Sequence, residues 1–89
     1  MPIISMFFGV IVYMFSHEEK GPSPPHVHAA YGDDYAIFSI QDGVLLEGKL
    51  PENKQILVQA WIEIHKEDLQ ADWCLAVSGQ TPLPIKPLD

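Results

Sequence analysis

The chain has 89 residues, of which 47% are hydrophobic and 19% are charged. A folded chain of this length buries roughly 64% of the surface that its unfolded form exposes, which suffices for one small core and excludes a two-domain enzyme. Five lysines, no arginine and twelve acidic residues give a formal charge of −7. Because phosphate recognition depends on Lys and Arg, direct nucleic-acid binding is not expected, and the acidic balance favours a basic protein or a cationic ligand as partner.

The first 16 residues are uncharged, but a membrane-spanning helix needs about 20 apolar residues, and a signal peptide needs a basic leader. Their β-branched residues favour a buried strand, so no membrane association is expected. The single cysteine, Cys74, excludes an internal disulfide and a Cys–Cys metal site. We expect Cys74 to be a buried thiol and the compartment to be the cytoplasm.

The first 50 residues carry the signals of an antiparallel sheet of about four strands. Residues 3–8 and 10–16 read as one bent strand or two short ones, with Gly9 as the bend or bulge. Asp42-Gly43 is a strong hairpin signal, because both residue types tolerate positive φ. A loop is predicted over 17–25, and further strands over 26–32, 35–40 and 44–50.

The pattern changes to a helical period after Pro51, which suits the first turn of a helix. One apolar stripe is formed by Ile56, Leu57, Ala60, Trp61 and Ile64, and a second by Leu69, Trp73, Ala76 and Val77.

The two stripes differ in phase, which predicts two helices with a break near residues 65–67, and Gly79 predicts the end of the second. We expect an α+β fold in which both helices cover one face of the sheet. Residues 1–79 are expected to form a single domain, and residues 80–89 an extended, proline-rich tail.

The segment PPHVH, residues 24–28, is the strongest candidate site. On a strand, His26 and His28 point to the same face, about 6.6 Å apart along the chain. His-x-His places two imidazoles on one divalent metal such as zinc. Three interpretations stay open: half-exposed structural histidines bonded to neighbours, metal ligands, or acid–base and pH-sensing groups. The candidate third ligands are His17, Asp33, Asp34 and His65.

Other polar and aromatic groups have simpler interpretations. The carboxylates of Asp33-Asp34 and Glu18-Glu19 face opposite ways on extended chain, so neither is an obvious acid–base pair. Asp68 and Asp72 share a helix face at i, i+4, which favours a solvated acidic surface. Trp61 and Trp73 lie on the apolar stripes and are expected to belong to the core.

Taken together, four segments resemble the small bacterial family named domain of unknown function 4160. They are MPIISMFFGVIVYMF, PPHVH followed by Tyr31-Gly32, EGKLP at 47–51, and WIEIHKEDLQADWCLAVSG at 61–79. The resemblance implies a Pro-Pro-His-x-His motif on residues 24–28. It also implies a small protein encoded beside this one, as in a toxin–antitoxin-like pair. Ala29 and Ala30 stand where members commonly carry charge, which argues against a ribonuclease-type toxin.

Two functional hypotheses follow. The first is a regulatory interaction module that binds a co-encoded small protein, with a homo-oligomer as a further form of assembly. The alternative is a metal-binding protein or metal-dependent enzyme built on His26 and His28. No catalytic motif identifies a reaction.

Overall fold

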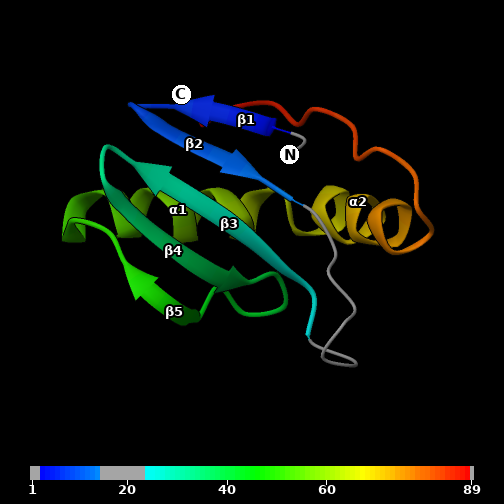
Figure 1. Ribbon diagram of the computed structural model, residues 1–89, viewed down its shortest axis with the longest axis horizontal. Coiled ribbons are helices and arrows are strands. Elements are labelled where there is room, and N and C mark those ends of the chain that lie inside the picture. The colour runs from blue at the N-terminus through cyan, green and yellow to red at the C-terminus, as the bar shows by residue number, and fades with distance from the viewer. Residues whose placement is uncertain (1–2, 15–23, 89) are drawn as a thin grey trace.

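A computed structural model describes residues 3–14 and 24–88 of the chain. Five antiparallel strands form one sheet in the order β1-β2-β3-β4-β5, and two helices follow (Figure 1). The strands are β1 (Ile3–Phe7), β2 (Val10–Tyr13), β3 (His26–Tyr31), β4 (Asp34–Ser39) and β5 (Leu45–Lys49); the helices are α1 (Glu52–Ile64) and α2 (Lys66–Val77). The α+β class and the antiparallel sheet followed by two helices are confirmed. The sheet has five strands instead of about four, because the first apolar segment forms a hairpin.

The β1–β2 hairpin turns at Phe8 and Gly9, whose φ angles are +50° and +81°. Two successive positive φ values are typical of the tight turns that match the twist of paired strands. The strand expected over 10–16 is described only to Met14. The loop expected over 17–25 lies outside the described residues apart from Pro24 and Pro25.

The helices begin and end close to where the sequence predicts. Pro51 precedes α1, His65 separates the two helices, and Gly79 follows α2 with φ +83°. The N–H groups of Gly79 and Gln80 donate to Ala76 and Leu75 carbonyls, which is the Schellman arrangement that ends a helix. None of the helices in the described residues is long and apolar enough to cross a bilayer.

The predicted stripe on α1 is only partly confirmed: Trp61 is buried and Leu57 packs against the core, but the other three members do neither. Ile56, Ala60 and Ile64 are exposed, and the buried residues of α1 are Val58, Trp61 and Ile62. The apolar residues encircle much of this helix, so the pattern alone did not determine which side meets the sheet. On α2, Leu69 and Ala76 are buried as expected, whereas Val77 is exposed.

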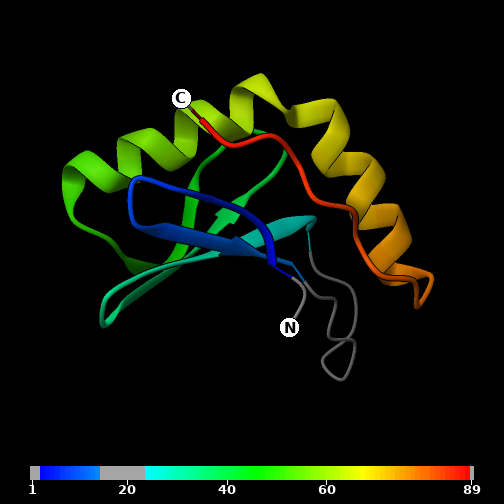
Figure 2. The ribbon, with the colours of Figure 1, turned by 90° about the horizontal axis from the view of Figure 1, so that it is seen from above.

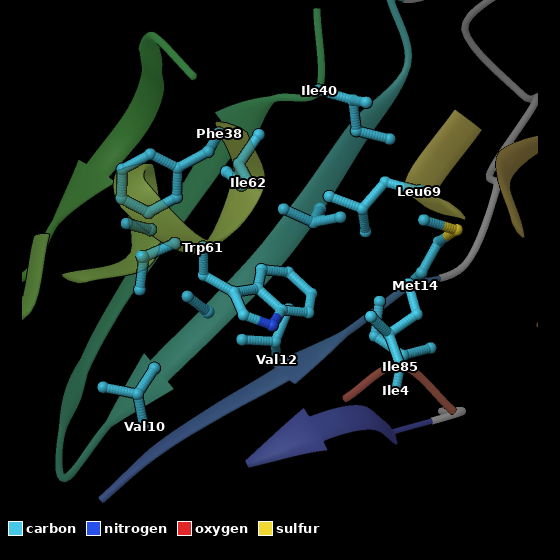
Figure 3. Close-up of a cluster of buried hydrophobic side chains, with 14 of the residues drawn as sticks. Ile4, Val10, Val12, Met14, Phe38, Ile40, Trp61, Ile62, Leu69 and Ile85 are labelled. Carbon is cyan, nitrogen blue, oxygen red and sulfur yellow. The ribbon is translucent and has the colours of Figure 1, made fainter. Parts of the chain in front are cut away.

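The core lies between the helices and one face of the sheet, with Trp61 fully buried at its centre (Figures 2 and 3). Residues without regular secondary structure after α2 return across this core. Ile85 is buried and its N–H donates to the Ile4 carbonyl at 2.7 Å, while the Trp61 Nε1–H donates to the Lys86 carbonyl at 2.9 Å.

Two further expectations about α2 are wrong. Cys74 is exposed instead of buried. Asp72 is buried instead of solvated, and its Oδ1 accepts the N–H of Leu83 at 3.1 Å. The burial of Asp72 follows from the returning C-terminal segment, which contacts this side of α2 and which helical periodicity alone does not place.

Candidate functional site

The face of the sheet opposite the core carries two rows of residues that lie side by side across the strands. The strand register places Met6, Ile11, Ala30, Tyr35 and Lys49 in one row, called the apolar row, and Ile3, Tyr13, His28, Ile37 and Glu47 in the other, called the histidine row. Directly paired residues share a face, so both rows lie on the outer face of the sheet. In Figure 1 this face lies in front of α1.

His28 occupies the middle of the histidine row, where it contacts Tyr13 of the same row and Tyr35 of the apolar row. Its ring stacks on that of Tyr13, with centroids 5.3 Å apart and planes 17° apart. Its Nδ1 lies 2.5 Å from the Tyr35 hydroxyl, a hydrogen bond between neighbouring strands. Tyr35 is also hydrogen-bonded to Tyr13. The three side chains therefore form one connected polar group near the centre of the outer face.

His26 enters the same group from the start of β3. Its ring meets the His28 ring edge to face, with centroids 5.2 Å apart and planes 64° apart. The Nδ1–H donates to the Pro24 carbonyl at 2.8 Å, because a carbonyl can only accept. Trp73 of α2 also packs against His26, with 4.9 Å between the ring centroids. Pro24 and Trp73 thus hold the His26 ring in a defined orientation.

Burial controls the protonation of this group. Burial, followed by the nearby charge of His26, lowers the pKa of His28 to about 4. His28 is therefore a neutral imidazole at neutral pH. Burial also raises the pKa values of Tyr13 and Tyr35, so both remain phenols. A pKa near 4 lies well below the range that general acid–base catalysis or pH sensing at neutral pH requires, which disfavours those interpretations of His28.

The fold brings together two of the candidate metal ligands and separates the others. His26 and His28 are neighbours, and His28 is buried instead of half-exposed. Asp33 and Asp34 lie at the β3–β4 turn, at the opposite end of β3 from His26.

His65 lies between the helices, with its ring 5.6 Å from the core residue Trp61, and its Nδ1 is 3.8 Å from Asp68 Oδ2. His17 is outside the described residues. Within residues 3–14 and 24–88, no group of three His, Cys, Asp or Glu side chains could hold a metal ion.

Three members of the site were missed from the sequence: Tyr13, Tyr35 and Trp73. The sequence does contain a signal for Tyr13 and Tyr35. Each lies in a predicted strand, and the alternation of that strand assigns the side chain to one face of the sheet. Joining them to His28 requires the strand register, and joining Trp73 to His26 requires the position of α2 relative to β3. Trp73 is partly buried against the core, as expected, while it also forms part of the site.

Comparison with known proteins gives one match. The protein-family model described as Domain of unknown function (DUF4160) matches residues 9–74, which is more than half of the 89-residue chain. The matched segment contains β2 to β5, α1 and most of α2, and with them all the side chains of the histidine–tyrosine group. No curated protein and no solved structure was found to match the chain.

Proposed function

The chain belongs to the DUF4160 family, and from this premise we propose that it is an interaction module that binds a small basic protein through the outer face of its sheet. The observation that carries the proposal is the apolar row. Met6, Ile11 and Tyr35 lie on β1, β2 and β4 and are 58%, 37% and 40% exposed, and Ala30 of β3 lies between Ile11 and Tyr35. Exposed apolar side chains that lie side by side are typical of protein interaction sites.

The fold leaves the apolar row exposed. In Figure 2, α1 lies over the opposite face of the sheet, and α2 extends past the end of the sheet, where Trp73 meets His26. Within the described residues, Met6, Ile11 and Tyr35 therefore stay accessible. Ile3, at the edge of the histidine row, adds a further side chain that is 53% exposed. Tyr35 is exposed at the centre of the face and rests on the buried rings of Tyr13 and His28, so it is a rigid aromatic side chain of the kind that anchors protein interfaces.

Charge supports a basic partner over a second copy of the chain. Each copy carries a formal charge of −7, so two copies facing each other would repel, whereas a basic protein would be attracted over a long range. In this proposal the partner is the small protein encoded beside this one, in a toxin–antitoxin-like pair acting in the cytoplasm. Residues 1–79 form the binding domain and residues 80–89 are its C-terminal extension.

The test is binding of the purified chain to its co-encoded protein, measured by isothermal titration calorimetry at two salt concentrations. We expect a one-to-one complex that weakens as salt rises. Met6→Asp should weaken binding at least tenfold. The matched control is Ile64→Asp, since Ile64 is 63% exposed but lies on α1, away from the outer face of the sheet.

Three results would overturn the proposal. They are no complex with the co-encoded protein, equal loss of affinity in both variants, or a homodimer of the chain alone that Met6→Asp dissociates. The last result would assign the face to a second copy. Light scattering coupled to gel filtration distinguishes it, and unfolding curves of both variants check that each remains folded.

A further inference from the structure

The segment that follows α2, residues 81–88, has a three-residue pattern of burial and is here called the proline segment. Pro82 and Ile85 are buried and Leu88 is half-buried, whereas the two residues between each of them are exposed. This is the period of a polyproline II helix, which has three residues per turn. The sequence favours the same conformation, because proline fixes its own φ and directs the residue before it to extended backbone. Three such pairs occur in the segment: Thr81-Pro82, Leu83-Pro84 and Lys86-Pro87.

Hydrogen bonds to three other elements fix the proline segment on the domain. The Leu83 N–H donates to Asp72 of α2 at 3.1 Å, and the Ile85 N–H donates to a carbonyl of β1 at 2.7 Å. The Lys86 carbonyl accepts the indole N–H of Trp61 at 2.9 Å. A polyproline II helix makes no internal hydrogen bonds, so its backbone groups are free to bond in this way. Figures 1 and 2 show the segment running back from the end of α2 to β1.

The outward side of the segment carries the two remaining prolines. Pro84, Lys86 and Pro87 are exposed, and Leu83 is 63% exposed. Pro84 and Pro87 are three residues apart, so in a polyproline II helix they lie on the same side. This is the PxxP spacing that SH3-type domains bind in aromatic-lined grooves. We propose that the proline segment is a binding motif for an SH3-type domain, whose groove contacts Pro84 and Pro87.

Folding of the chain prepares the segment for such a partner. A flexible peptide must be ordered when it binds, at an entropic cost, whereas this segment is already ordered by its contacts with the domain. The buried side, with Pro82 and Ile85, is a different side of the helix from that of Pro84 and Pro87, so both contacts are compatible. The folded chain should therefore bind at least as tightly as a free peptide of the same sequence.

This surface is separate from the outer face of the sheet. The segment is bonded to Trp61, a core residue of α1, and its Ile85 belongs to the same core. Met6 and Ile11 of the apolar row lie on the other face of the sheet. The proline segment consequently predicts a second partner, whose binding does not require the proposed function to be correct.

The experiment titrates the full chain into a panel of purified SH3 domains in a calorimeter, beside a synthetic peptide of residues 80–88. We expect a one-to-one complex with at least one domain, in which the chain binds at least as tightly as the peptide. Pro84→Ala and Pro87→Ala should each weaken binding at least tenfold, and both sites are exposed, so the variants should fold. Pro51→Ala is the matched control, since it removes a proline outside the segment, and it should leave the affinity unchanged.

Three results would overturn this proposal. They are binding of the chain to no domain of the panel, an equal loss of affinity in Pro84→Ala and Pro51→Ala, or binding of the peptide but not of the chain. The last result would mean that packing on the domain hides the motif. Unfolding curves check that each variant remains folded. The outer face is tested with Met6 and a different protein, so either proposal can fail without the other.

Discussion

The hydroxyl of Tyr35 lies 2.5 Å from Nδ1 of His28 and so joins β4 to β3 across the outer face of the sheet. Replacing Tyr35 by Phe keeps the ring and removes this hydroxyl from a buried imidazole. We expect the free energy of unfolding to fall by about 1–3 kcal/mol, since a buried polar atom then loses its partner. Denaturant titration of Tyr35→Phe measures the loss. Tyr31→Phe, which keeps the ring under the Lys54 ammonium, is the control. An equal loss of stability in both variants would contradict a stabilising role of the hydrogen bond between Tyr35 and His28.

The low pKa of His28 predicts that the stability of the folded protein is sensitive to acid. The unfolded chain takes up a proton on this histidine near pH 6.5, whereas the folded chain does so only near pH 4. Between these values the unfolded state binds more protons, so stability should fall as the pH is lowered from 6.5 to 4, by up to about 3 kcal/mol. The measurement is the unfolding free energy against pH for the wild type and for His28→Gln. A His28 ring resonance that titrates near pH 6.5 in the folded state would contradict this prediction.

The sequence was sufficient for the fold class and for most element boundaries, because these depend on local signals. Hydrophobic alternation indicated the strands, and Pro51 and Gly79 marked where α1 begins and α2 ends. The prediction of which side of α1 is buried was partly wrong, since Ile56 and Ile64 are exposed and Val58 is buried. Apolar residues on both sides of the helix made the local pattern ambiguous, and tertiary packing decided between them.

The candidate site was only half predictable for the same reason. His26 and His28 share a strand, so their common face follows from the two-residue period of β structure. Their partners Tyr13, Tyr35 and Trp73 come from three other elements, and their proximity depends on strand register and helix placement. A register shift of one residue would turn Tyr13 or Tyr35 to the opposite face, which no single segment of sequence specifies.

Gly48 in β5 is required by a close approach of two strands. Its φ is +76°, and a Cβ at this position would lie 2.2 Å from the Tyr35 carbonyl oxygen. We expect Gly48→Ala to cost at least about 2 kcal/mol of stability, since it combines backbone strain with a backbone clash. Gly32→Ala is the matched control, because Gly32 also has positive φ (+59°) but no heavy atom within 4 Å of the added Cβ. Thermal unfolding compares the two; equal losses would mean that the β4–β5 contact is looser than described.

Asp72 is a buried carboxylate that holds the chain after α2. Burial raises its pKa, the Leu83 N–H opposes this, and Asp68 adds to the rise. The folded state therefore holds a proton on Asp72 more readily than the unfolded state does. Ionisation of this group accordingly costs stability above the folded pKa, and this cost is relieved as the pH falls through that value.

Asp72→Asn keeps an oxygen acceptor for Leu83 and removes the buried charge, so at pH 7 its unfolding free energy should equal or exceed that of the wild type. Asp72→Ala removes the acceptor and should cost about 1 kcal/mol, with the C-terminal residues losing protection from proteolysis. The comparison is made by denaturant titration at pH 7 and at acidic pH, where the advantage of Asn should disappear. If Asn and Ala lose stability equally at pH 7, the negative charge itself, and not the acceptor oxygen, holds the segment in place.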